Sequence, residues 1–198
     1  WMQGANQGFV IPDPIRPGNV YVVVNDDPNN DFDTGDHGDV KLARSTDYGQ
    51  TWAVSTVSHA PAGTLQAFPM GASDQLGNLV VAWWDTRRGF TNGGSNFLLD
   101  IYATVSSDGG LTFTNDFRVN DLPFDPDLGA PCRFGNNNNC GTNDGSTPST
   151  LRIGEYNGIV AANGTAYIIW TGNQTPPNPQ AAPPTVAGGT HESGLRAG

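Results

Sequence analysis

An eight-residue pattern occurs twice and constrains the fold more than any other feature of this chain. STDYGQTW at residues 45–52 (the first box) recurs as SSDGGLTF at residues 106–113 (the second box), an offset of 61 residues. The flanks repeat as well, because VYVVVND at 20–26 and LVVAWWD at 79–85 are apolar runs that end in Asp and precede a further strand-like run. A long repeat made of strand-like segments predicts a series of similar sheets.

Composition also favours short strands joined by turns. The chain has 198 residues with 26 Gly and 15 Pro, and this density of turn-forming residues leaves little room for helix. Within residues 1–173 we place a first unit at about 7–58, a second at about 66–120 and a partial third at about 155–173. Residues 174–198 are predicted to be a Pro/Ala/Gly-rich tail. The sequence therefore predicts an all-β protein of four-stranded antiparallel units.

The two boxes share the form Ser-x-Asp-x-Gly-x-Thr-aromatic. The shared positions are Ser45, Asp47, Gly49, Thr51 and Trp52 in one copy, and Ser106, Asp108, Gly110, Thr112 and Phe113 in the other. Glycine permits a positive φ, the Asp and Ser oxygens can accept turn amides, and the aromatic ring can pack under the turn. The form resembles the Asp-box, or bacterial neuraminidase repeat, of sialidases and related β-propellers, and the resemblance covers roughly residues 5–173. It implies sialidase-like propeller blades, incomplete within this chain because a ring takes about 4 to 8 blades.

The resemblance places an active site on the face away from the boxes, where the long loops 27–38, 86–98 and 121–154 are expected. Arg87 is one candidate there, in the segment Asp85-Thr86-Arg87-Arg88. It could pair with Asp85 in a structural role, or it could present its guanidinium to a carboxylate or to sugar hydroxyls. We weigh the structural ion pair ahead of the binding role.

Arg152, Glu155 and Tyr156 form a second candidate group, at the entry to the third unit. In sialidases, as the resemblance implies, an arginine cluster holds the substrate carboxylate, a glutamate activates a tyrosine nucleophile, and an aspartate is the acid/base. Glu155 and Tyr156 are adjacent, so a regular strand would point them to opposite sides, which favours a structural role for both. The Arg-Ile-Pro segment that opens many sialidase domains is missing, and no catalytic role is assigned to Arg16.

Two further features suggest a metal ion and a disulfide. The acidic segment 26–39 offers Asp31, Asp33, Asp36 and Asp39 as possible calcium ligands, or else forms a solvated turn cluster. Cys132 and Cys140 enclose a short polar loop, which favours a local disulfide in an oxidising compartment and hence a secreted or cell-surface protein. The adjacent residues Trp83 and Trp84 should point to opposite faces of their strand.

The net charge of −10 excludes some partners. An acidic surface repels nucleic acids and anionic membranes, and no stretch approaches the roughly 18 apolar residues of a spanning helix. Three functions remain. The first is a noncatalytic glycan-binding, adhesive or structural surface module whose partner is a glycan or an extracellular protein. The others are part of a sialidase-like glycoside hydrolase and a calcium-stabilised assembly subunit. The unfinished ring would be completed by the rest of the same propeller or by further copies of the chain.

Overall fold

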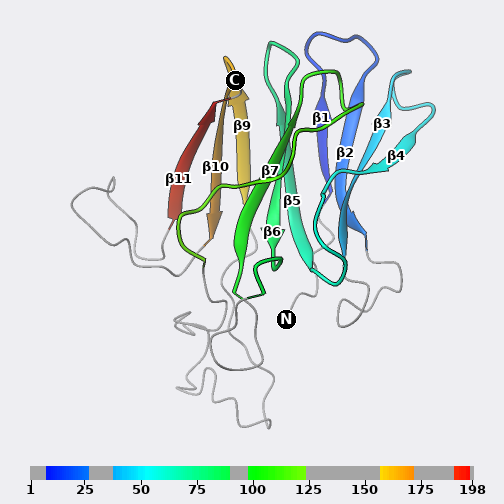
Figure 1. Ribbon diagram of the computed structural model, residues 1–198. Coiled ribbons are helices and arrows are strands. Elements are labelled where there is room, and N and C mark those ends of the chain that lie inside the picture. Colours follow the sequence, from blue (N-terminus) through cyan, green and yellow to red (C-terminus); the bar gives the residue numbers. More distant parts are fainter. Residues whose placement is uncertain (1–7, 27–37, 90–97, 124–156, 172–189, 197–198) are drawn as a thin grey trace, which may run out of the picture.

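The structure is a computed structural model of the 198-residue chain, and it describes residues 8–26, 38–89, 98–123 and 157–171 together with the strand 190–196. These ranges form three antiparallel sheets and contain no helix (Figure 1). Sheet A has the order β1 (Phe9–Pro12), β2 (Val20–Asp26), β3 (Asp39–Ser45), β4 (Ala53–Thr56). Sheet B has the order β5 (Gln66–Ser73), β6 (Leu79–Asp85), β7 (Asp100–Ser106), β8 (Phe117–Arg118). The prediction of an all-β chain built from four-stranded antiparallel sheets is confirmed.

Sheet C consists of β9 (Gly158–Ala162), β10 (Thr165–Thr171) and β11 (Thr190–Arg196), with β10 in the middle. Strand β11 lies inside the range 174–198 that the sequence assigned to a tail, and it pairs with β10 along its whole length. The segment THESGLR lacks the apolar run of the other strands. The pairing shows that the backbone groups at the edge of β10 can pair with a segment whose sequence pattern does not predict a strand.

Sheet B lies between the other two sheets, and an apolar cluster fills each interface. Between sheets A and B, Tyr21, Val23 and Leu42 pack against Leu79 and Trp83. Such packing through both faces explains why every residue of β6 is buried.

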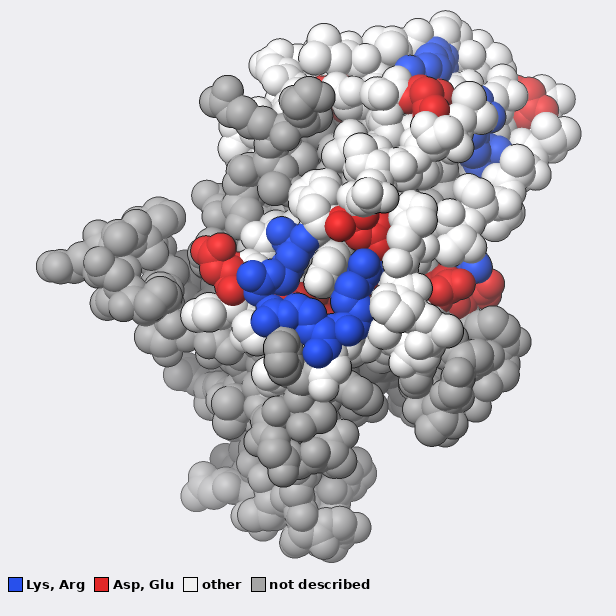
Figure 2. Space-filling model, viewed as in Figure 1, with Lys and Arg blue, Asp and Glu red and all other residues white. Residues whose placement is uncertain are grey.

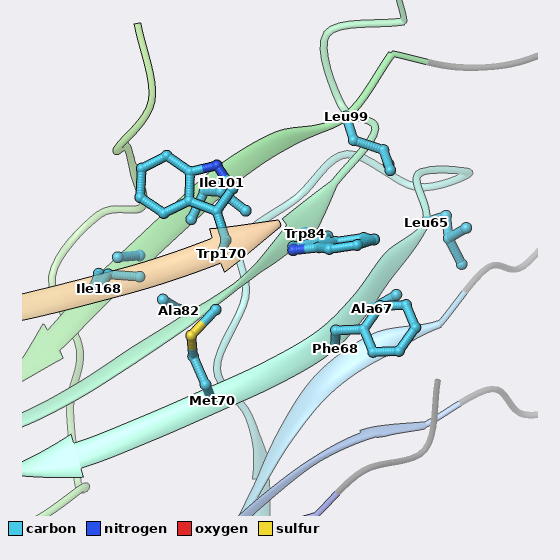
Figure 3. Close-up of a cluster of buried hydrophobic side chains, with 11 residues drawn as sticks. Leu65, Ala67, Phe68, Met70, Ala82, Trp84, Leu99, Ile101, Ile168 and Trp170 are labelled. Carbon is cyan, nitrogen blue, oxygen red and sulfur yellow. The ribbon is translucent and has the colours of Figure 1, made fainter. Parts of the chain in front are cut away.

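Between sheets B and C, Trp84 lies with Met70 and Ala82 against Ile168 and Trp170 (Figure 3). Trp83 and Trp84 therefore point to opposite faces, as predicted, and each fills a different interface. The two largest buried side chains of the described residues thus hold the three sheets together.

Both boxes connect the third strand of a sheet to the fourth, and they lie at the upper end of the sheets in Figure 1, together with the β1–β2 and β5–β6 turns. Strands β2 and β6 end at the opposite end. Long loops at one end of rigid strands are the usual place for a binding site. The candidate site residues predicted from the sequence are therefore expected at the lower end of the sheets in Figure 1.

Candidate functional site

The two boxes form the same hydrogen-bond network. In the first box, Asp47 Oδ1 accepts the Thr51 N–H (2.8 Å), Asp47 Oδ2 accepts the Thr51 hydroxyl (2.5 Å), and Ser45 Oγ accepts the Gly49 N–H (2.8 Å). In the second box the corresponding distances around Asp108 and Ser106 are 3.0, 2.6 and 2.8 Å. The Ser and Asp oxygens of both boxes thus accept the turn N–H groups, as predicted from the sequence, and their role is to stabilise a turn.

These bonds also shift the acidity of the two box aspartates. Hydrogen bonds from the Thr51 hydroxyl and amide, and from Ser45, lower the pKa of Asp47 to about 2. At Asp108, burial raises the pKa. The hydrogen bonds from Thr112 and Ser106 outweigh burial and hold the pKa of Asp108 well below its usual range. Both carboxylates are therefore charged at neutral pH and serve as acceptors, which leaves them unsuited to proton transfer there.

Two arginines of sheet A reach across to the turns of sheet B. Arg16 Nη2 donates to the Ser107 carbonyl (3.0 Å) and Arg16 Nη1 to the Gly77 carbonyl (3.1 Å), while Arg44 Nε donates to the Gly109 carbonyl (2.7 Å). Arg16 is itself held by an ion pair with Asp13 (2.9 Å). We call Arg16 and Arg44 the arginine clamp; the pair holds the second box against sheet A.

A repeated turn aspartate escaped the sequence analysis. Asp13 Oδ1 accepts the amides of Ile15 and Arg16 (both 3.0 Å), and Asp74 Oδ1 accepts those of Leu76 (3.0 Å) and Asn78 (2.9 Å). Asp74 follows Asp13 by 61 residues, the offset of the boxes, and each is followed by a Gly-Asn pair. That shared spacing was the signal that could have identified these turns.

Arg87 lies at the other end of sheet B, between two carboxylates. Arg87 Nη2 is 2.7 Å from Asp85 Oδ2 and 2.9 Å from Asp116 Oδ2, and its guanidinium carbon lies 4.0 Å from the centre of the Tyr102 ring. Burial lowers the pKa of Arg87, but the hydrogen bonds and charges of Asp85 and Asp116 outweigh it, so that pKa lies above its ordinary value. The side chain is only 13% exposed. The structural ion pair with Asp85 is thus present, and a second one with Asp116 reinforces it.

His59 joins this group from the connection between the two sheets. Its backbone N–H donates to Asp116 Oδ2 (2.8 Å), and its Nδ1 lies 3.0 Å from Asp116 Oδ1. Asp116 therefore bridges His59, which follows sheet A, and Arg87, which follows β6. Neither His59 nor Asp116 was predicted, because the contact joins residues 57 positions apart in the sequence.

A second ionic group surrounds Asp100 at the start of β7. Arg88 Nη1 lies 3.2 Å and Arg118 Nη1 3.6 Å from Asp100 Oδ1, and Asn120 Nδ2 donates to the same oxygen (3.0 Å). Asp100 is buried, while Arg88 and Arg118 are about one third exposed. Figure 2 shows Lys and Arg side chains gathered beside Asp or Glu side chains near the middle of the viewed face. The arginines at this end of sheet B are thus held by buried carboxylates.

The remaining candidates fall mainly outside the described residues. Those that lie outside are Asp31, Asp33, Asp36, Cys132, Cys140, Arg152, Glu155 and Tyr156. Asp39 is described, and its Oδ2 pairs with Lys41 Nζ at 3.0 Å. Within the described ranges, no group of three or more His, Cys, Asp or Glu side chains could hold a metal ion. The calcium and disulfide predictions therefore stay predictions.

Comparison with known proteins yields a likeness at the level of structure. No protein-family model matches the chain, and no curated protein matches its sequence. Among solved structures, "Hadza microbial sialidase Hz136" is similar, with 21% sequence identity and a TM-score of 0.47. The match covers 56% of this chain and 25% of that protein, so this chain corresponds to about a quarter of its length. The described ranges contain no helix long and apolar enough to cross a membrane.

Proposed function

We propose that this chain is part of a noncatalytic, extracellular propeller module that presents its long-loop end to glycans or to an extracellular protein. The observation that carries this proposal is the state of Arg87. A cation that receives a substrate carboxylate has to be accessible and free to change partners. Arg87 is instead held between Asp85 and Asp116 and covers the Tyr102 ring.

The neighbouring arginines support the same interpretation. Arg88 and Arg118 share the buried carboxylate of Asp100, so that a ligand anion would compete with a fixed internal one. Removing a buried ion-pair partner leaves an uncompensated charge, and such pairs are costly to break. This end of sheet B is a rigid support, and adjacent loops are the part that can vary to recognise a ligand.

The alternative function is that of a sialidase-like glycoside hydrolase acting on extracellular glycans. It is favoured by the order Arg152, Glu155, Tyr156, which leads directly into β9 (Gly158–Ala162), the first strand of sheet C. Strand β9 begins at the end of the sheets opposite to the boxes (Figure 1). The two functions therefore assign different roles to the same short segment.

One assay separates the two functions. The chain and its variants Tyr156→Phe and Arg87→Lys are incubated with a fluorogenic sialoside, and binding to a glycan array is measured in parallel. We expect no sialoside hydrolysis above that of buffer. We also expect binding on the glycan array, and Tyr156→Phe should leave that binding unchanged. Turnover that Tyr156→Phe abolishes, with the thermal unfolding midpoint unchanged, would establish the hydrolase instead.

A further inference from the structure

The β9–β10 turn ties sheet C to sheet B. It consists of Asn163 and Gly164 and lies beside the β5–β6 turn at the upper end of the sheets in Figure 1. The Gly164 N–H donates to Asp74 Oδ2 (2.9 Å), and the Asn163 N–H donates to Gln75 Oε1 (3.1 Å). Gln75 Nε2 donates in return to Asn163 Oδ1. Two neighbouring residues of the β5–β6 turn therefore hold both residues of the β9–β10 turn.

The conformation of the turn explains why Asn and Gly occur together here. The φ angle is +53 at Asn163 and +73 at Gly164. Asparagine and glycine adopt such left-handed angles more readily than other residues, and the pair is typical of tight hairpin turns. The turn thus favours a dipeptide that is also chemically labile.

The lability comes from the glycine that follows the asparagine. A glycine has no side chain to shield its backbone nitrogen, so this nitrogen can attack the carboxamide carbon of the preceding asparagine. The bond between Gly164 N and Asn163 Cγ forms, the bond between Cγ and Nδ2 breaks, and ammonia leaves with the amide proton. Water then opens the succinimide at either carbonyl and yields aspartate or isoaspartate. Asn163 is exposed, so solvent water can reach the succinimide.

The contacts of the turn oppose this reaction in the folded chain. Before the attack, the Gly164 nitrogen has to lose its proton, yet this N–H donates to Asp74, which is buried. Burial raises the pKa of Asp74, but hydrogen bonds from Asn78 and from the Gly164 amide outweigh burial, so this pKa lies below its ordinary value. The carboxylate is therefore charged at neutral pH, and a neighbouring negative charge disfavours loss of the amide proton. Gln75 in addition holds the carboxamide oxygen of Asn163.

The products of the reaction fit the turn less well than asparagine does. Aspartate carries a negative charge next to the Gly164 amide, which Asp74 already binds, and like charges at short range repel. Isoaspartate routes the main chain through the former side chain and adds a carbon atom to a two-residue turn. A longer turn disturbs the pairing of Thr165 with Ala162, which closes the hairpin. Either product should weaken the hydrogen bonds between the two turns.

We propose that Asn163 is a site of spontaneous deamidation, that Asp74 and Gln75 restrain the reaction in the folded chain, and that deamidation loosens sheet C from sheet B. The modification needs no enzyme and no co-reactant other than water. It concerns the junction between two sheets, and it stands whether or not the module binds or hydrolyses glycans.

The sequence supplies an internal reference for the test. Asn157–Gly158 is a second Asn-Gly pair, and trypsin cleavage after Arg152 and Arg196 leaves both pairs on the peptide 153–196. The 198-residue chain is incubated at neutral pH, with and without concentrated urea, and fragmentation mass spectrometry of this peptide follows the conversion of each asparagine. Gln75→Ala removes the side chain that holds Asn163. Gln50→Ala is the matched control, because Gln50 is an equally exposed glutamine in the first box.

We expect Asn163 and Asn157 to convert at similar rates in urea, and Asn163 to convert about tenfold or more slowly in the folded chain. Gln75→Ala should raise the rate at Asn163 in the folded chain by about threefold or more, whereas Gln50→Ala should leave it unchanged. In the purified deamidated chain, and in Asn163→Asp, hydrogen exchange should accelerate by about threefold or more at the β9 and β10 amides and stay constant in sheet A.

Three results would overturn the proposal. Intact Asn163 in urea, after Asn157 on the same peptide has converted, means that the site does not deamidate. Equal rates at Asn163 in the folded and the unfolded chain, or equal rates in Gln75→Ala and Gln50→Ala, mean that the β5–β6 turn does not restrain the reaction. Unchanged exchange of β9 and β10 in both the deamidated chain and Asn163→Asp means that the modification leaves the junction intact.

Discussion

The first and second boxes have nearly the same internal bonds and very different surroundings. The second box is held by Arg16 and Arg44 and packs its Gly110 backbone against sheet A. Among the described residues, the first box contacts only its own sheet, and its Tyr48 and Trp52 side chains are exposed. The comparison teaches that the motif forms its turn through local hydrogen bonds. Its contribution to the stability of the fold depends on whether a neighbouring sheet packs against it.

The largest effect should come from a methyl group added inside the second box. Gly110→Ala places a Cβ at φ +78 and 2.9 Å from Leu42 Cδ2, and Leu42 is fully buried. Backbone strain of about 1–2 kcal/mol and overpacking of about 1–3 kcal/mol should together lower the free energy of unfolding by about 2–5 kcal/mol. Urea unfolding followed by fluorescence measures this change.

Gly49→Ala in the first box is the matched control for that variant. It has nearly the same φ, +84, but the new Cβ meets only Trp52 at 3.4 Å. The loss should then be about 1–2 kcal/mol, from backbone strain alone. Equal losses for the two alanines would contradict the difference in packing.

An intermediate effect is expected from the arginine clamp. Arg44→Ala removes the hydrogen bond to the Gly109 carbonyl and should lower the free energy of unfolding by about 1 kcal/mol, since the site is only partly buried. Hydrogen exchange should accelerate in the second box, at the Leu111 and Thr112 amides, and stay constant in the first. Acceleration in both boxes to the same extent would show that the arginine acts globally.

Acid should weaken the first box. The pKa of Asp47 falls from 3.8 to about 2 on folding, so its charged form stabilises the folded chain above pH ~4, and this contribution is lost as the pH falls toward 2. Asp47→Asn should therefore flatten the decline of the thermal midpoint between pH 4 and 2. A variant that declines as steeply as the parent chain would mean that other carboxylates control acid unfolding.

The smallest effect is predicted at Tyr48, where the second box has Gly109. Tyr48 has φ +60 and a largely exposed ring. Tyr48→Gly relieves about 1 kcal/mol of strain but gives the unfolded chain about 0.4–1 kcal/mol of extra freedom. The thermal midpoint should therefore hardly change. A clear loss would show that the ring contributes packing against the Gly18 turn.

The same contrast explains which parts of the site were predictable. Apolar runs located the second strands of sheets A and B, β2 and β6, because these strands pack into the cores between the sheets. Strand β11 was missed because its pairing rests on backbone groups. The Arg87–Asp85 pair was foreseen because the two residues are two positions apart, whereas Asp116 reaches Arg87, and His59 reaches Asp116, through folding alone.

The sequence by itself determined the box turns, because a Ser, an Asp and a Thr within eight residues satisfy the turn amides without help from the rest of the chain. It also determined that Trp83 and Trp84 serve opposite faces, since strand geometry alternates side chains. Only the tertiary structure decided that one box is clamped and the other open, and that Arg87 is held between two carboxylates. Those outcomes depend on which sheet packs beside which, a relation between residues far apart in the sequence that local chemistry does not encode.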